Sequence, residues 1–387
     1  MKNLLIKGDN IQGLNYLLEN RKMKGKIDLV YIDPPFATNG NFTITDGRAS
    51  TISNSRNGDI AYSDKLTGKN FIEHLRKRLL LLKELLSEQG SIYLHIDYKI
   101  GHYVKMMMDE VFGIENFRND ITRIKCNPKN FDRIGYGNIK DLILFYTKSS
   151  KPIWNEPREK YTGKDIENLF SKIDKQGKRY TTVPIHAPGE TENGKSNQPF
   201  KGIMPPKGRH WRTDVETLAQ WDKEGLIEWS STGNPRKIIF ANEREGKRIQ
   251  DVWEFKDPQY PTYPTEKNSE LLDLIIRTSS NPESIVLDCF CGSGTTLKSA
   301  QIIERKWIGI DQSEHALKAT IEKLETIKGD LFVANPEYEF IEMEKILTEK
   351  APNKALHPTA IPLRSIAAGE LSRYEARGSK DDKGRKH

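Results

Sequence analysis

Apolar and polar positions alternate in a regular way along the first third of the chain. Three short apolar runs have the length and β-branched content of buried strands: residues 4–7, 27–32 and 91–97. Three longer segments repeat apolar residues every three or four positions, as amphipathic helices do: residues 11–20, 71–89 and 100–111. Gly90 is expected to end the second helix. With two more strands predicted near 120–125 and 142–147, the pattern indicates an α/β fold, with a sheet covered by helices.

The same alternation returns toward the end of the chain after a long interruption. An apolar-periodic helix around 271–276 leads to a strand at 285–287, a helix at 296–304, a strand at 307–310 and a helix ending near 327. The interruption itself is basic and rich in turns. The predicted parts are the first half of an α/β domain, an inserted domain, the second half and a flexible tail: residues 1–147, 148–262, 263–350 and 351–387.

The strand at 27–32 runs directly into Asp33-Pro34-Pro35-Phe36. The carboxyl ends of strands in open α/β sheets are where ligands bind. Prolines lack an amide donor, so the Pro34 carbonyl and the Asp33 carboxylate can both accept hydrogen bonds from a substrate. An exocyclic amine has two donors to give, and Phe36 offers a face for stacking a heterocycle. The motif indicates a site for a planar amine, although Asp-Pro-Pro alone is also compatible with a simple turn.

A glycine-containing turn follows the strand at 285–287 and opens the next helix. Its polar, aromatic and glycine positions are Asp288, Phe290, Gly292, Ser293, Gly294 and Thr295. Glycines let the backbone approach a ligand closely, and the free amides of a helix start can receive a carboxylate. Dinucleotide sites usually show G-x-G-x-x-G and P-loops show Gly-Lys-Ser/Thr, and this turn has neither.

Together the two motifs resemble those of the DNA amino-methyltransferases. The resemblance covers about residues 3–324 and is specific at both motifs. In that family an [DNS]-P-P-[YFW] motif handles the target amine, and an F-x-G-x-G loop holds S-adenosylmethionine. The order found here, with the catalytic motif first and the cofactor loop late, resembles the beta class. The resemblance implies a Rossmann-like S-adenosylmethionine-dependent methyltransferase fold with circularly permuted motif order and an inserted target-recognition domain. It makes the catalytic residues Asp33, Pro34, Pro35 and Phe36.

The resemblance also implies cofactor contacts outside the glycine turn. Asp9 would lie beside the adenine of the cofactor, although it is equally suited to cap the helix that follows it. Thr265 and Lys267 resemble the motif at the methionine end, where Asn268 stands in place of the more common proline. Asp311 ends the second strand, 19 residues beyond the first glycine of the turn, at a spacing that suits the ribose hydroxyls.

An aspartate in the first motif position resembles adenine-N6 enzymes, whereas cytosine-N4 enzymes mostly carry serine there. We therefore expect a site-specific DNA methyltransferase that acts on an adenine flipped out of double-stranded DNA. Cytosine-N4 methylation and a DNA-binding regulator without turnover remain alternatives. Cytosine C5 chemistry is disfavoured, because no cysteine follows a proline to serve as the nucleophile. The scattered histidines predict no metal site.

Charge and tryptophan content set the middle of the chain apart. The net charge is +7, and residues 117–262 hold 27 Lys+Arg against 20 Asp+Glu, a surplus of 7 that accounts for all of it. Most of the six tryptophans lie there as well: Trp154, Trp211, Trp221, Trp229 and Trp253. Interleaved basic and aromatic residues favour a nucleic-acid partner. A solvated basic surface over a small tryptophan core is the alternative interpretation.

Two further features bear on the surroundings of the site. Residues 37–64 are polar and aperiodic, which predicts a long functional loop beside the catalytic motif, with disorder as the alternative. The chain begins without a signal-peptide pattern, has three cysteines and lacks an apolar run of the ~20 residues that a membrane span needs, so a cytoplasmic protein is expected. A cognate restriction endonuclease and a second copy of the chain are possible protein partners.

Overall fold

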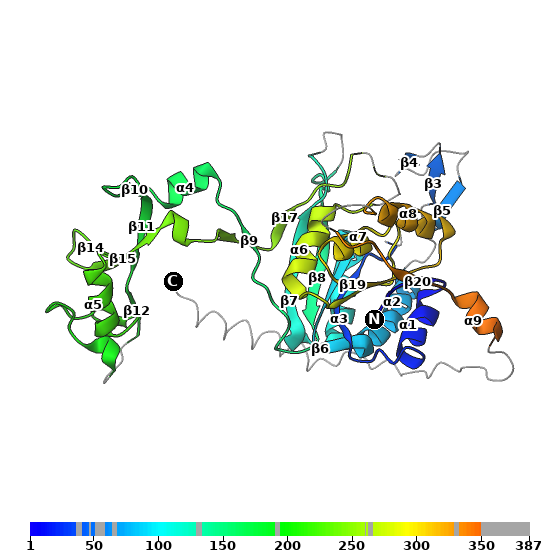
Figure 1. Ribbon diagram of the computed structural model, residues 1–387, viewed down its shortest axis with the longest axis horizontal. Helices are drawn as coiled ribbons and strands as arrows, with labels where there is room; N and C mark the ends of the chain where they lie inside the picture. Colours follow the sequence, from blue (N-terminus) through cyan, green and yellow to red (C-terminus); the bar gives the residue numbers. More distant parts are fainter. Residues whose placement is uncertain are drawn as a thin grey trace. The chain divides into compact units, whose positions relative to one another are not determined.

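The computed structural model describes residues 1–35, 41–45, 48–50, 59–63, 68–128, 134–189, 194–259, 261, 266–328 and 333–349. By internal contacts the chain divides into two units, Met1–Met343 and Glu344–His387. Within the first unit a nine-stranded sheet is the central feature (Figure 1). The predicted tail, residues 351–387, lies outside the described residues.

The large sheet draws its strands from both ends of the chain. In spatial order they are β17 (Val252–Glu254), β7 (Phe117–Ile124), β8 (Lys140–Thr147), β6 (Leu86–Ile96), β2 (Ile27–Ile32), β18 (Ile285–Asp288), β19 (Lys306–Asp311), β1 (Asn3–Lys7) and β20 (Tyr338–Glu342). Every neighbouring pair is parallel except those that involve β8, which runs antiparallel to β6 and β7. The predicted α/β class is therefore confirmed.

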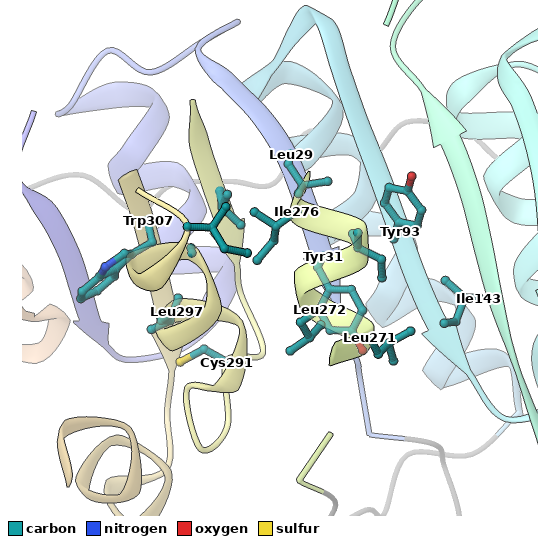
Figure 2. Close-up of a cluster of buried hydrophobic side chains, with 14 of the residues drawn as sticks. Leu29, Tyr31, Tyr93, Ile143, Leu271, Leu272, Ile276, Cys291, Leu297 and Trp307 are labelled. Atoms are coloured by element: carbon teal, nitrogen blue, oxygen red, sulfur yellow. The ribbon is translucent and has the colours of Figure 1, made fainter. Parts of the chain in front are cut away.

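Helices cover the sheet because its strands carry apolar residues on both faces. The helices of the first unit that belong to this sheet are α1 (Asn10–Glu19), α2 (Gly68–Leu85), α3 (Tyr98–Phe112), α6 (Ser269–Ser279), α7 (Thr295–Ile302) and α8 (Glu314–Glu325), with the short turn η1 (Ile114–Asn116). Leu29 and Tyr31 of β2 pack in one apolar cluster with α6, as Figure 2 shows. The alternate residues Val30 and Ile32 are also fully buried, as a strand covered on both sides requires.

The helix predicted at 71–89 ends earlier than expected. α2 stops at Leu85, and the strand β6 begins at Leu86. The carbonyls of Glu84 and Leu85 accept backbone bonds from the segment that leads into β2, which ends the helix there. Gly90 thus lies inside β6 and is not a cap. A Cβ at Gly90 would stand 2.9 Å from the Ile27 carbonyl oxygen, so glycine permits the close approach of two strands.

Two other segments hold more regular structure than the sequence indicated. Within the predicted loop at 37–64, β3 (Asn41–Thr45), β4 (Arg48–Ser50) and β5 (Asp59–Ser63) form a small antiparallel sheet. β20 follows an aperiodic stretch and pairs with β1 at the edge of the large sheet. In both cases the strands are formed by backbone pairing and lack the apolar period on which strand prediction relies. The helix α9 (Met343–Glu349), also unpredicted, falls almost wholly in the second unit.

The middle region forms small sheets of its own. Its elements are β9 (Arg158–Glu159), α4 (Gly163–Leu169), β10 (Lys172–Ile173), β11 (Arg179–Pro184), β12 (His186–Pro188), η2 (Lys195–Asn197), β13 (Arg209–Trp211), α5 (Val215–Lys223), β14 (Ile227–Trp229), β15 (Pro235–Phe240), η3 (Ala241–Glu243) and β16 (Lys247–Arg248). A separate core holds it together: Ile185, Phe200, Trp211 and Leu218. At least one of the tryptophans therefore has the packing role of the alternative interpretation.

The end of the interruption belongs to the large sheet. β17 pairs in parallel with β7, so residues 252–254 are not part of the separate middle region to which the sequence assigned them. The fully buried Arg123 of β7 fastens this return segment: it donates to the Phe255 carbonyl at 2.8 Å and to Asp257 at 2.6 Å. No periodic signal marks a three-residue edge strand, which explains the difference.

Candidate active site

The two motifs meet at the carboxyl ends of neighbouring strands. β2 and β18 are adjacent and parallel, so Asp33, which follows β2, and Asp288, which ends β18, lie at the same edge. From β18 the chain continues outward to β19, whereas from β2 it continues in the opposite direction to β6. This reversal is the topological switch point at which open α/β sheets bind ligands.

Asp33 has two unlike carboxylate oxygens. Its Oδ2 lies 2.5 Å from the ammonium Nζ of Lys267, and both side chains are largely buried, at 16% and 10% exposure. Its Oδ1 is buried and has no hydrogen-bond partner among the residues that the structure describes. A buried acceptor without a donor is costly, so Oδ1 is suited to a donor supplied by a ligand. Pro34 beside it is buried and Pro35 partly so.

Asp288 holds the glycine turn in place from below. Its Oδ1 accepts the Phe290 amide at 3.0 Å, and its Oδ2 accepts the Thr296 hydroxyl at 2.6 Å. Burial raises the pKa of Asp288 to about 7, against these two hydrogen bonds, which favour the ionised form. The side chain is therefore used inside the protein, and Phe290 is placed partly exposed at the edge of the site.

Asp311 ties the glycine turn to the next strand. Its Oδ2 accepts the Gly292 amide at 2.9 Å, and its Oδ1 accepts the Ser313 amide at 2.8 Å. Burial raises the pKa of the carboxyl. Each carboxylate oxygen has a second lone pair, so these backbone bonds are compatible with further bonds to hydroxyl groups.

Gly294 takes a conformation that few other residues tolerate. Its φ of 74° and ψ of 21° are left-handed, and it immediately precedes α7. A Cβ there would stand 2.7 Å from Cγ2 of the buried Thr320, so only glycine fits. Ser293 and Thr295 on either side are buried. The turn therefore brings bare backbone and the first amides of a helix to the same strand edge.

Asp9 has the capping role that the sequence left open. Its Oδ1 accepts the Ile11 amide at 2.8 Å at the start of α1, and its Oδ2 lies 3.1 Å from Nη2 of the buried Arg78. It follows β1, the strand next to β19, so it also stands at the edge where the two motifs meet. Phe36 and Thr265 fall outside the described residues, and their expected roles stay predictions.

No signal in the sequence pointed to the charged pair of Lys323 with Glu266 in the site. Lys323 of α8 donates to Glu266, at 2.5 Å, and to the hydroxyls of Ser293 and Thr295, at 2.9 and 2.8 Å. It is one lysine among several on an amphipathic helix, and its partners lie up to 57 residues away in the chain. Asn268, where the related motif commonly has proline, caps α6 by accepting the amides of Glu270 and Leu271.

A buried polar chain runs from β2 into the neighbouring strands. The Tyr31 hydroxyl lies 2.9 Å from Nδ1 of His95, whose Nε2 lies 3.3 Å from Asp141. Burial lowers the pKa of His95, so the ring is neutral near pH 7. Despite its burial, Asp141 has a pKa held well below its usual value by His95 and by Lys125, at 2.6 Å. In the sequence, only a histidine inside an apolar strand hints at this row of buried polar side chains.

The fold and the paired strand-end motifs define a class of α/β enzymes that bind S-adenosylmethionine. Comparison with known proteins identifies the family: the DNA methylase profile matches residues 27–322. The type II methyltransferase M.EcaI of Enterobacter cloacae is 40% identical over 329 residues, which cover 84% of this chain and 69% of that protein. The chain belongs to the N6/N4 DNA methylase family.

A more distant relative, of the type III class, is longer than this chain. The probable type III restriction-modification enzyme HindVI Mod subunit of Haemophilus influenzae is 25% identical over 397 residues, covering 84% of this chain and 50% of that subunit. Among solved structures, the M1.HpyAVI complex with S-adenosylmethionine has 16% identity and a TM-score of 0.45, covering 83% of this chain and 98% of that one. The PvuII cytosine-N4-specific methyltransferase has 13% identity and a TM-score of 0.47, covering 90% and 91%.

S-adenosylmethionine is the methyl donor of this family, and the residues at the strand edge fit it. The left-handed Gly294 lets the turn lie close against Thr320, so that α7 begins directly at the strand edge. Asp311 stands at the end of the strand next to that turn, with lone pairs in excess of its two backbone bonds. Within the part of the chain that the structure describes, no helix is both long and apolar enough to cross a membrane, and no cluster of side chains suits a metal ion.

Proposed function

We propose that this chain transfers a methyl group from S-adenosylmethionine to the N6 amine of an adenine that has been flipped out of duplex DNA. The observation that carries the proposal is Asp33 Oδ1, a buried acceptor without a donor at the switch point of the sheet. An aspartate in this motif position also resembles the adenine enzymes of the family. A base amine inside a duplex cannot reach such a site, so the nucleotide must leave the stack.

The cofactor residues in this proposal surround the glycine turn. Gly292, Ser293, Gly294 and Thr295 would receive the methionine end, and Asp311 the ribose, with contributions from Asp9, Thr265, Asp288 and Phe290. When bound, S-adenosylmethionine supplies an electrophilic methyl on a positively charged sulfur. The arrangement is supported by the aspartates that end β18 and β19 beside this turn. Adjacent parallel strands bring the site of the methyl donor and the site of the methyl acceptor to one edge.

Asp33 is assigned the handling of the amine. Neutral adenine N6 is a poor nucleophile, because its lone pair is delocalised into the ring. An N–H held by Oδ1, together with the Pro34 carbonyl, would turn the nitrogen lone pair toward the methyl group. The nitrogen would take the methyl group as the sulfur–carbon bond breaks, with the bonding pair left on sulfur as a neutral thioether. The proton that the nitrogen then loses would pass to the Asp33 carboxylate at Oδ1.

Analysis of methylated bases tests the reaction directly. Plasmid DNA from a host that expresses the chain should contain N6-methyladenine, and DNA from a host expressing Asp33→Ala should lack it. N4-methylcytosine in place of N6-methyladenine would assign the same machinery to cytosine. Absence of both bases, with folded protein in the cell, would favour the DNA-binding regulator. A cognate nuclease for the methylated site would place the chain in restriction-modification, the setting named for its HindVI relative.

We propose that the middle region, which runs from β9 to β16 (residues 158–248), contacts DNA. Three arginines surround His186 closely enough that, after burial, they further lower its pKa: Arg209, Arg212 and Arg236. Arg209 of this cluster is exposed, and so is Lys207, two residues before it in the chain. Clustered positive charge of this kind binds phosphates and releases counterions.

Replacing Lys207 and Arg209 together with alanine should flatten the salt dependence of DNA binding. The slope of log K against log salt should fall by about 2, because two phosphate contacts are lost. Affinity should be measured by fluorescence anisotropy between low and physiological salt. Lys24→Ala is the matched control, since Lys24 is an exposed lysine paired with Glu84 in the other part of the chain. An unchanged slope in the double variant would remove this cluster from the DNA interface.

A further inference from the structure

Two consecutive residues link the two motifs of the site. Glu266 pairs with Lys323, which also donates to Ser293 and Thr295 of the glycine turn. Lys267 pairs with Asp33 of the catalytic motif. We call Glu266 and Lys267 the clasp. The side chains of both ion pairs are between 10% and 16% exposed, so water screens these pairs only weakly.

The clasp is fixed to the sheet from its C-terminal side. Asn268, the next residue, caps α6 and donates to the Lys256 carbonyl at 3.0 Å. The helix α6 packs its apolar face in the same cluster as Leu29 and Tyr31 of β2 (Figure 2). The backbone at the clasp is therefore anchored, and its side chains can hold their partners in place.

The contact between Lys267 and Asp33 divides the work of the carboxylate. With Oδ2 engaged by the ammonium at 2.5 Å, rotation of the carboxylate is restrained, and Oδ1 is the atom left to accept from a ligand. An ion pair in which only one oxygen is used makes a directed acceptor out of a symmetric group. Orientation of this kind contributes strongly where an in-line displacement depends on placing the nucleophile.

We propose that Lys267 is a positioning residue that holds Asp33 so that Oδ1 faces the target amine. In this proposal Glu266, the residue before it, links Lys267 to the glycine turn through Lys323. The proposal rests on the proposed function. It differs from the cofactor contact that the sequence predicts for Lys267. Because the same two-residue segment touches both halves of the site, a change at the cofactor turn is transmitted to the catalytic carboxylate.

The test compares Lys267→Met with Lys267→Arg in single-turnover methyl transfer at saturating DNA and cofactor. Lys267→Met should lower the rate by about 10-fold to 100-fold, since misplacement of a reacting group has effects of that size. Its affinity for S-adenosylmethionine in calorimetry should stay within about twofold. Lys267→Arg should recover most of the rate, because it restores the cation. Lys328→Met is the matched control, since Lys328 forms a surface pair with Glu325.

Two outcomes would overturn the positioning role. One is a Lys267→Met enzyme with a near-normal saturated rate and an affinity for the cofactor weakened about tenfold or more, which would make Lys267 a cofactor ligand. The other is a normal rate with normal affinity. If Lys267→Met does not fold, Lys267→Gln retains a donor and takes its place. Wild-type base analysis is run in parallel, so failure of the proposed function is recognised separately.

A double-mutant cycle and a Glu266 variant complete the test. Adding Lys267→Met to Asp33→Asn should lower the rate by less than about twofold more, because the residue acts through Asp33. Independent, multiplying losses would contradict that. Glu266→Gln should lower both the rate and the cofactor affinity several-fold, because Lys323 then loses its carboxylate partner beside the glycine turn. A Glu266→Gln enzyme unchanged in both would show that the clasp does not connect the two motifs.

Discussion

Asp33→Ala should lower the rate of methyl transfer by about 10² or more, as the loss of a single preorganised polar contact does at other active sites. Asp33 Oδ1 is the proposed acceptor for the target amine, and alanine removes this buried oxygen. Affinity for S-adenosylmethionine and for DNA should change little, because neither depends on that oxygen. Single-turnover methyl transfer on folded protein, beside a thermal melt, is the measurement.

The structure offers a matched control on the same strand. Asp28 of β2 accepts the Ser87 hydroxyl at 3.0 Å and the Ile285 amide at 3.2 Å, which are bonds within the fold. Asp28→Ala should therefore lower the melting temperature and leave the rate per folded molecule near normal. Removing Asp33 also leaves Lys267 without its carboxylate, so some loss of stability is expected there too. Near-native rates in Asp33→Ala would refute the catalytic assignment.

Gly294→Val should abolish measurable binding of S-adenosylmethionine. At φ 74° a β-branched residue is strained, and its Cβ would collide with Thr320 at 2.7 Å. Relief of that contact displaces the turn between β18 and α7, where the methionine end of the cofactor is proposed to lie. Calorimetric titration with the cofactor measures the loss, and circular dichroism checks that the sheet remains folded.

The control for Gly294 is another glycine with free space around it. A Cβ at Gly163, at the start of α4, would meet nothing within 4 Å, and its backbone is not left-handed. Gly163→Val should therefore bind the cofactor normally. Wild-type affinity in Gly294→Val would exclude the turn from the cofactor site, whatever the behaviour of the control.

The sequence alone determined the sheet strands with strong apolar runs, the helices between them and the two motifs at strand ends. These features depend on residues close together in the chain: periods of two or 3.6 in apolar residues, prolines after a strand, and glycines before a helix. Asp33 and Gly294 are therefore recognisable as candidate site residues from their neighbours in the chain. The resemblance of the two motifs to one family added their order and their chemistry.

Tertiary structure alone decided which charges meet. The pairs of Lys267 with Asp33 and of Lys323 with Glu266 join residues that no local pattern relates, because the strand order brings distant segments to one edge. Gly90 became a point of close strand approach and not a helix end, since its neighbour is the carbonyl of Ile27. Local periodicity reports which face of a segment is buried, whereas partner choice depends on the packing of the whole sheet.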